Sequence, residues 1–156
     1  MPHIHDLIDF TVEAFVVHKN KVLLRKHDKY NMWLSVGGHI ELDEDPNQAA
    51  LREVKEEVGL DVKIIGEAIN IPENGPEYME LIPPLFLNRH RINPNHEHVT
   101  LVYFATSDSD KLNLTDGEEK SDDCRWFTQS ELKELEGLRP SVKAQALLAL
   151  QRLATN

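Results

Sequence analysis

Three glutamates near the middle of the chain have the type and spacing of metal ligands. Glu53, Glu56 and Glu57 lie three and four positions apart, and a helix places such residues within about 100° of one another. Like charges at this spacing repel, so folding alone does not favour the arrangement. Carboxylate oxygens are the ligands that Mg2+ and Mn2+ prefer. The triplet therefore indicates a divalent-cation site, although a solvated acidic helix face would show the same pattern.

The neighbouring residues predict the helix that must position this triplet. Asp45 is suited to the N-cap, with Pro46 at the first helical position and Gln48 three residues after the cap. Gly59 is suited to end the helix. We therefore expect a helix over residues 46–58. Its packing side is expected to carry Ala50, Leu51, Val54 and Val58.

Two glycines precede this helix and let the backbone turn tightly and approach a ligand closely. Gly37 and Gly38 follow the short apolar run at 32–36. Here a main-chain carbonyl could face a cation with no side chain between them. The sequence thus predicts a tight turn followed by a short helix.

The stretch from Gly37 to Leu60 reads GGHIELDEDPNQAALREVKEEVGL and resembles the Nudix box of the MutT-like Nudix hydrolases at every specified position. The frame consists of Gly38, five residues, Glu44, seven residues and then REVKEEVGL. Outside the box, Val36 stands where many relatives carry proline. Asp43, before the first box glutamate, stands where many carry glycine. The resemblance implies an α+β fold, an α/β/α sandwich with a mixed β-sheet between helices, as a single domain over residues 1–156.

The resemblance also implies the chemistry, which is attack of water on phosphorus to cut a phosphoanhydride bond. The cofactor would be Mg2+, with Mn2+ as a further candidate. The implied metal ligands are the Gly37 carbonyl, Glu53, Glu56 and Glu57.

Other box residues are expected to support these ligands. Arg52 would orient the box carboxylates, with Glu44 among them. Gly38, Glu44 and Gly59 would shape the box itself. The general base stays open between Glu53, Glu56, Glu97 and water activated by the metal alone.

Three residues outside the box are candidates to contact the substrate. Arg25 would lie near its phosphates, although an exposed strand arginine is the plainer interpretation. Trp33 could stack on a base or pack beneath the box loop. Tyr78 lies in the proline-rich segment 72–84, which we expect to be a loop over one face that contacts the leaving group.

Two predicted strands carry histidines beside charged residues. Residues 85–92 include Arg89, His90 and Arg91, and the segment from 97 to 106 follows His96 and includes His98. Zinc is one interpretation, but no spacing here matches a structural zinc site, and strand alternation separates neighbouring residues. A phosphate-contacting basic edge and a plain strand surface are the alternatives.

The remaining elements are predicted from apolar periodicity and turn residues. Strands are expected over 10–17, 22–25 and 61–71, loops over 26–31 and 108–123 with Asp116-Gly117 as a turn, and a late strand near 122–127. Thr128 and Glu131 form a capping box for a following helix. A last helix begins near Arg139. Its apolar stripe, which indicates core packing or a dimer contact, consists of Val142, Ala146, Ala149, Leu150 and Leu153.

Composition limits the partners and the compartment. The net charge of -10 and the pI of about 5.2 disfavour a nucleic-acid polymer or an anionic membrane as partner. Cys124 is the only cysteine, so no internal disulfide forms. The N-terminus lacks the features of a signal peptide, and no apolar run approaches the ~20 residues of a membrane span. We therefore expect a cytoplasmic monomer or homodimer.

The function that these observations predict is metal-dependent diphosphohydrolysis of a small molecule. The substrate would be a nucleoside triphosphate or another nucleoside diphosphate derivative, and the sequence does not choose between them. One alternative is an inactive Nudix-like module that senses nucleotides or binds proteins. Another is isomerase chemistry on an isoprenoid diphosphate, which the complete box disfavours.

Overall fold

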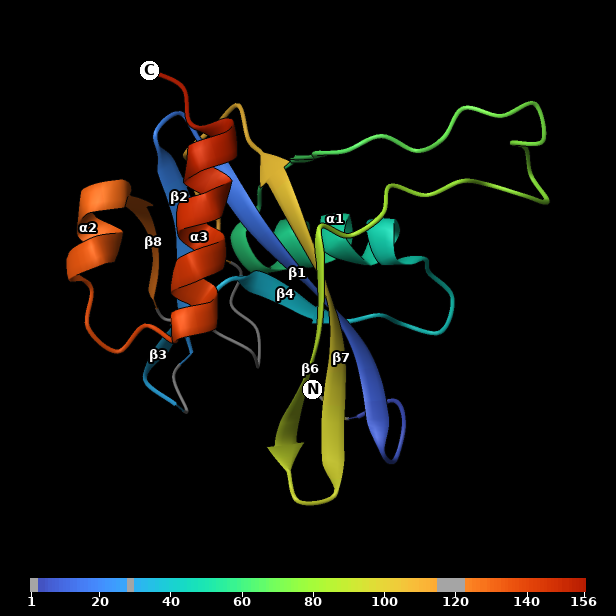
Figure 1. The fold of residues 1–156 in the computed structure, drawn as a ribbon, viewed down its shortest axis with the longest axis horizontal. Coiled ribbons are helices and arrows are strands. Elements are labelled where there is room, and N and C mark those ends of the chain that lie inside the picture. Colours follow the sequence, from blue (N-terminus) through green and yellow to red (C-terminus); the bar gives the residue numbers. More distant parts are fainter. Residues whose placement is uncertain (1–2, 28–29, 115–122) are drawn as a thin grey trace.

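A mixed β-sheet forms the centre of the computed structural model, which describes residues 3–27, 30–114 and 123–156 (Figure 1). The order of strands is β3-β2-β1-β7-β5, with β4 paired to β1, β6 to β7 and β8 to β2. β1 and β7 run parallel, and the other pairs are antiparallel. The strands are β1 Ile8–His18, β2 Lys21–His27, β3 Met32–Leu34, β4 Val36–His39, β5 Lys63–Ile64, β6 Phe86–Asn93, β7 His96–Thr106 and β8 Asp123–Thr128.

Helices cover both faces of the sheet. α1 (Pro46–Val58) packs on one face, and α2 (Gln129–Glu134) and α3 (Pro140–Leu153) lie on the other (Figure 1). The predicted α/β/α sandwich with a mixed sheet is therefore confirmed.

The alternation of β1 explains how one strand serves two cores. Phe15 and Val17 belong to the apolar cluster that includes α3, whereas Ala14 and Val16 belong to the cluster beneath α1. Successive strand residues point to opposite faces. Both sets are almost fully buried, so β1 is the central element from which either face can be reached.

The prediction of a strand over 61–71 is wrong for most of its length. Only Lys63 and Ile64 pair with β7, and Gly66 then has a φ of 135°, which takes the backbone away from the extended ladder. The region from 65 to 85, which is described throughout, contains no helix or strand, as expected for the proline-rich part. Its middle part projects beyond the sheet (Figure 1), whereas its two ends pack against the core through Ile65, Ile82 and Leu85.

The predicted loop at 26–31 is also shorter than expected. Lys26 and His27 continue β2, because they pair with Trp33 and Met32 of β3. Polar side chains are tolerated there because cross-strand pairing, and not local propensity, decides the extended conformation. Asn31, with a φ of 48°, then makes the turn back into β3.

The elements of the C-terminal part follow the prediction. β8 contains Cys124, and Thr128 and Glu131 form a reciprocal capping box at the start of α2. The apolar stripe of α3 is buried against the sheet, including Val142 and Ala146. The predicted turn Asp116-Gly117 lies outside the described residues. Within the described part, none of the helices is both long and apolar enough to span a bilayer.

Candidate active site

The helix that carries the three glutamates is α1, and its ends are built as expected. The Asp45 side chain accepts a hydrogen bond from the Gln48 N–H at 2.9 Å, and the Gln48 side chain accepts one from the Asp45 N–H at 3.0 Å. Pro46 is the first helical residue, and Gly59 ends the helix with a φ of 74°. These local signals predict the helix at Pro46–Val58, and the distant Asn113 N–H also donates to the Val58 carbonyl at 2.9 Å.

The three carboxylates do not share one solvent-facing side. Glu53 is 3% exposed, and the Glu57 side chain is 8% exposed, whereas that of Glu56 is 61% exposed. The triplet therefore lies along the border between the packed side of α1 and solvent. Two of its three charges are held inside the protein, where a counter-charge is required.

The prediction for the packing side of α1 is wrong at one position. Leu51 is 41% exposed, whereas Ala49 is fully buried in its place. β4 lies against the flank of α1 that carries Glu53, which rotates the buried stripe towards Ala49 and turns Leu51 outwards.

Gly37 and Gly38 lie within β4 and not in a tight turn, contrary to expectation. Glycine is required at both positions because neighbouring atoms lie too close to leave room for a side chain. A Cβ at Gly38 would collide with the Glu53 carboxylate, and one at Gly37 would collide with the Val12 carbonyl oxygen. The absence of a side chain at Gly38 thus leaves the space in which a carboxylate meets the strand.

Arg52 gathers the box carboxylates with all five of its N–H donors. Its Nε and Nη2 donate to the two oxygens of Glu44 at 3.0 and 2.6 Å. Its Nη1 donates to Glu53 at 2.9 Å and to Glu56 at 3.0 Å, and Nη2 also donates to the His39 carbonyl at 2.9 Å. The guanidinium therefore fixes the positions of three carboxylates relative to β4.

Glu57 is held from two other directions. Its Oε1 lies 2.9 Å from Nη1 of Arg25, and its Oε2 accepts a hydrogen bond from the Gly37 N–H at 3.1 Å. Because that N–H points away from β1, the Gly37 carbonyl points the same way, as in every non-hydrogen-bonded antiparallel pair. The Gly37 carbonyl oxygen thus lies on the strand edge that faces Glu57.

The pair formed by Glu44 and Arg52 shifts the pKa of both side chains. The hydrogen bonds from Arg52 hold the pKa of Glu44 below its ordinary value, and the same contacts raise the pKa of Arg52. A partly buried carboxyl that the sequence did not single out is Glu13, which pairs with Gly37 across β1 and β4. Burial raises the pKa of Glu13 above its ordinary value, although Ser35 and Arg25 oppose the shift.

The other predicted site residues lie in different surroundings. Trp33 is partly buried, with its ring edge-on to Phe127 at a centroid distance of 4.9 Å, which is the packing arrangement. Tyr78 lies on the projecting segment, and its hydroxyl donates to Glu80 at 2.6 Å. Neither contact brings these side chains to the box.

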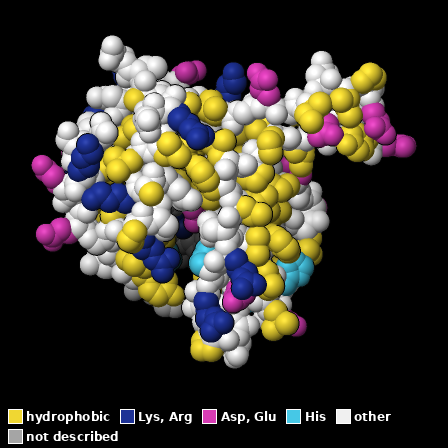
Figure 2. All heavy atoms as spheres, viewed as in Figure 1, with side chains coloured by type: hydrophobic (Ala, Val, Ile, Leu, Met, Phe, Trp, Pro, Cys, Tyr) yellow, Lys and Arg dark blue, Asp and Glu magenta, His cyan; other side chains and the backbone are white. Residues whose placement is uncertain are grey.

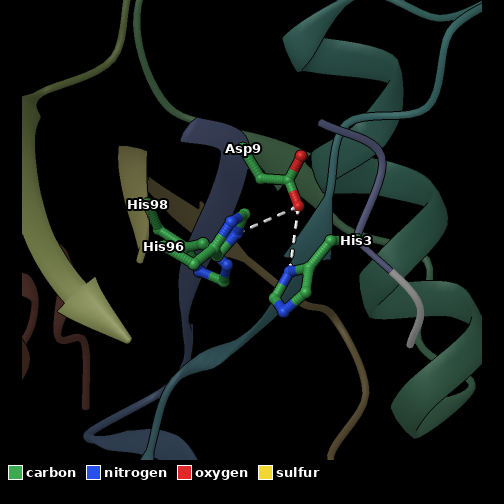
Figure 3. A group of neighbouring side chains, drawn as sticks. All are labelled: His3, Asp9, His96 and His98. Carbon is green, nitrogen blue, oxygen red and sulfur yellow. Dashed lines mark hydrogen bonds and ion pairs between the residues drawn. The ribbon is translucent and has the colours of Figure 1, made fainter. Parts of the chain in front are cut away.

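Glu97 lies on β7 beside two arginines of β6. Its oxygens are 3.4 Å from Nε of Arg89 and 3.6 Å from Nη2 of Arg91. On the opposite side of the same strand, His96 and His98 converge on Asp9 of β1 (Figure 3). The sequence offered one signal for this second group, the His-Glu-His spacing that places two imidazoles on one strand face.

The donor set of the box fits a hard divalent cation. Glu53, Glu56, Glu57 and the Gly37 carbonyl offer oxygen ligands only, and the space at Gly38 lets a carboxylate reach the strand. Oxygen ligands of this kind are those that Mg2+ and Mn2+ take. The residues present are therefore compatible with the metal that the fold implies.

A helix that holds several glutamates against a glycine-containing strand of a mixed sheet defines a class of phosphate-processing hydrolases. The model of the NUDIX domain matches residues 9–148 of this chain. The protein therefore belongs to the Nudix hydrolase family.

Solved structures of this family superpose over most of the chain. A NUDIX-family hydrolase from Clostridium perfringens is 35% identical, with a TM-score of 0.80, and the match covers 92% of this chain and 97% of that one. A MutT NUDIX hydrolase from Burkholderia pseudomallei is 19% identical with a TM-score of 0.64, covering 96% of this chain and 100% of that one. At this identity the second likeness shows the fold alone.

A curated relative is the dihydroneopterin triphosphate diphosphatase of Haemophilus influenzae. It is 38% identical over 94 residues, which are 60% of this chain and 57% of that protein. The match thus spans little more than half the length of the relative.

Proposed function

We propose that this protein is a metal-dependent diphosphohydrolase that acts on a nucleoside triphosphate or another nucleoside diphosphate derivative. The observation that supports this function best is the Arg52 network, which holds Glu44, Glu53 and Glu56 together next to Gly38. A structural salt bridge does not need three carboxylates on one guanidinium. A cation-binding site needs such crowding, because the ligands must stay charged and close.

In this proposal the ligands of the metal are the Gly37 carbonyl, Glu53, Glu56 and Glu57. Mg2+ or Mn2+, when bound, neutralises the diphosphate and lowers the pKa of a coordinated water. Arg52 keeps the carboxylates aligned through its fixed planar fork. Arg25 orients Glu57 and also brings a positive charge to the phosphates.

In this proposal the general base is one of three glutamates, or the metal alone activates the water and no separate base is needed. Glu53 and Glu56 each accept a hydrogen bond from Arg52, whereas Glu97 is paired with the arginines of β6. Each can be replaced by Gln in turn. The variant that removes the base loses the acidic limb of the pH–rate profile for turnover, and the other two retain it.

Local cations can meet a polyanionic substrate despite the negative net charge. Arg89 and Arg91 are exposed on β6, and Arg139 precedes α3 and acts electrostatically on Glu13 and His90. Figure 2 shows basic side chains beside a hollow on this face. We therefore propose that these cations attract the phosphates of the substrate.

The substrate class rests on the shared triphosphate. The name of the Haemophilus influenzae relative specifies a pterin triphosphate, which combines a nitrogen heterocycle with the same anhydride bonds as a nucleoside triphosphate. Tyr78 is the proposed contact to the heterocycle, and Trp33, which packs on Phe127 but is only partly buried, is a second candidate. A panel of nucleoside triphosphates, diphosphate derivatives and dihydroneopterin triphosphate would identify the preferred group.

The test is release of phosphate or pyrophosphate from this panel with Mg2+ and with Mn2+. We expect at least one compound to be hydrolysed and the reaction to stop when EDTA removes the metal. If the folded protein binds nucleotides but hydrolyses none of them, the proposal is wrong and the inactive sensing module takes its place.

A further inference from the structure

The Asp9 carboxylate is the centre of a group of imidazoles, of which only His39 belongs to the box. Asp9 is fully buried at the start of β1. Its Oδ2 lies 3.1 Å from Nδ1 of His3, 3.1 Å from Nε2 of His39 and 3.3 Å from Nε2 of His96. The Ile4 N–H also donates to this oxygen at 3.2 Å. Four nitrogens thus approach one oxygen that has two lone pairs.

The topology of the sheet assembles this group. His96 and His98 are two residues apart on β7 and therefore share a face. β7 runs parallel to β1 with His98 beside Asp9, and His39 lies on β4, which pairs with the other edge of β1. The N-terminal segment folds back so that the rings of His3 and His96 lie 3.7 Å apart at their centroids.

We define the Asp9 cluster as the four residues that each direct one ligand atom to a common point (Figure 3). They are His3, Asp9, His96 and His98. These atoms all lie within 4.8 Å of one another. A tetrahedral Zn2+ site has ligand atoms about 3.3 Å apart, given metal–nitrogen bonds of about 2.0 Å. Small side-chain rotations would therefore close the cluster around an ion.

Two imidazole nitrogens of the Asp9 cluster are buried without making a hydrogen bond within the described part of the chain. His96 is 3% exposed, and although its Nε2 lies 3.3 Å from the Asp9 carboxylate, neither this atom nor the Nε2 of His98 makes a hydrogen bond among the described residues. Buried polar atoms are normally paired, so each such atom calls for an explanation. A cation at the common point would accept both lone pairs.

Charge also argues against a plain network of ion pairs. Such a network would need several protonated imidazoles in contact, and they would repel one another. A neutral imidazole has a free lone pair and is the form that binds metals.

We propose that the Asp9 cluster binds one transition-metal ion, with Zn2+ as the expected occupant. Three imidazole nitrogens and one carboxylate oxygen suit Zn2+ and its neighbours, whereas Mg2+ prefers oxygen ligands. The ion would join the N-terminal segment to β1 and β7. His39 touches the cluster through its ring and the box through its carbonyl, which accepts from Arg52.

The test is metal binding by the full chain after dialysis against a chelator. Titration calorimetry with Zn2+, and absorption spectroscopy with Co2+ as a probe, are carried out in excess Mg2+ so that the box ligands do not compete. We expect one ion per chain and the strong visible absorption of four-coordinate Co2+. Absence of tight Zn2+ binding overturns the proposal.

Substitutions of individual histidines test whether the Zn2+ ion binds at the Asp9 cluster. His96→Gln removes a buried ligand, and His3→Gln removes one whose side chain is 43% exposed and which precedes β1. Each is expected to weaken Zn2+ binding at least about tenfold, since even outer-shell losses reach that size. His5→Gln is the matched control, because its main-chain N–H still donates to Asp9, and it should bind as the parent does.

Two further readouts make the result decisive. Circular dichroism in EDTA checks folding, and if His96→Gln does not fold, His3→Gln alone decides. Glu57→Gln should bind Zn2+ as the parent does. Parent-like binding by His3→Gln, or loss of binding in Glu57→Gln, would place the ion elsewhere and overturn the proposal.

Discussion

The box on α1 and the Asp9 cluster are both groups of buried ionisable side chains, but they are assembled in opposite ways. The box ligands lie within one short stretch of sequence and offer oxygen atoms. The Asp9 cluster draws on the N-terminal segment, β1 and β7, and offers mainly nitrogen atoms. Local spacing can therefore reveal the first site, whereas strand register alone creates the second.

The counter-charges of the two groups differ as well. In the box, Arg52 and Arg25 balance the carboxylates through short hydrogen bonds. In the Asp9 cluster one carboxylate faces several imidazoles, and burial lowers the pKa of one of them, His98. The first site is prepared for a hard cation and phosphates, and the second for a cation that prefers nitrogen.

The largest effect should come from Glu57→Gln, which removes a charge from the box alone. Gln can still accept the Gly37 N–H, so the fold is retained, but the loss of a charged ligand should lower turnover at least about 100-fold. Phosphate release under saturating Mg2+ measures this, with Glu73→Gln on the projecting segment as control. Turnover within about threefold of the parent would remove Glu57 from the site.

Arg52→Ala should damage both activity and stability, because it leaves three carboxylates without their shared donor. We expect the free energy of unfolding to fall by about 3 kcal/mol and the Mg2+ titration of activity to weaken. Arg125→Ala is the control, since its exposed pair with Glu131 contributes at most about 1 kcal/mol. An unchanged Mg2+ titration would contradict the orienting role of Arg52.

Removing and restoring metals should distinguish the box, which affects activity, from the Asp9 cluster, which affects stability. After EDTA treatment, Mg2+ should restore turnover, whereas Zn2+ at 100 times its dissociation constant should stabilise the fold by about 2.7 kcal/mol. For a chain of this size that corresponds to a rise in Tm of roughly 5–10 °C. Calorimetric scans of the parent and His3→Gln measure it. Equal Tm values with and without Zn2+ would leave the Asp9 cluster without a stabilising ion.

Asp45→Ala should test whether a change at the start of α1 affects the Asp9 cluster. It removes the N-cap of α1 and is expected to cost about 1 kcal/mol of stability, measured by urea denaturation. Zn2+ binding to the Asp9 cluster should not change, because no ligand there depends on the cap. A larger loss of stability, coupled to loss of Zn2+, would show that the two regions unfold as one unit.

The smallest expected effect is on the stability of the fold at acidic pH. Because the pKa of Glu44 is lower in the folded protein than the ordinary 4.5, its pair with Arg52 stabilises the fold above about that pH and is lost as the pH falls through the folded pKa. The Tm of Glu44→Gln should therefore depend less on pH below 4.5 than that of the parent. Parallel acid profiles would mean that Glu44 does not carry this dependence.

Several features could be read from sequence because their causes are local. The capping box at Asp45, the αL glycine at Gly59 and the carboxylate spacing on α1 all depend on residues within one or two helical turns. The same holds for the cap of α2 at Thr128. Because the box frame is one continuous stretch, residues 37–60 alone are sufficient to indicate the family.

Other predictions failed or stayed undecided because packing overrides local pattern. The exposure of Leu51 and the burial of Glu53 depend on which flank of α1 meets β4, and strand β5 is cut short at Gly66. The roles of Tyr78 and Glu97 remain predictions. The spacing of residues in the sequence does not predict which side chains of neighbouring strands or loops will lie beside Tyr78 and Glu97.

The amino-acid sequence by itself determined the box helix, its caps and the identity of its charged residues, because hydrogen bonds and side-chain spacing act over a few positions. Tertiary structure alone decided that Glu53 would be buried and that Asp9 would meet histidines more than 80 positions away. The reason is that a carboxylate or an imidazole acquires its chemistry from its neighbours in space. Those neighbours are set by strand register and by burial, which only the folded chain defines.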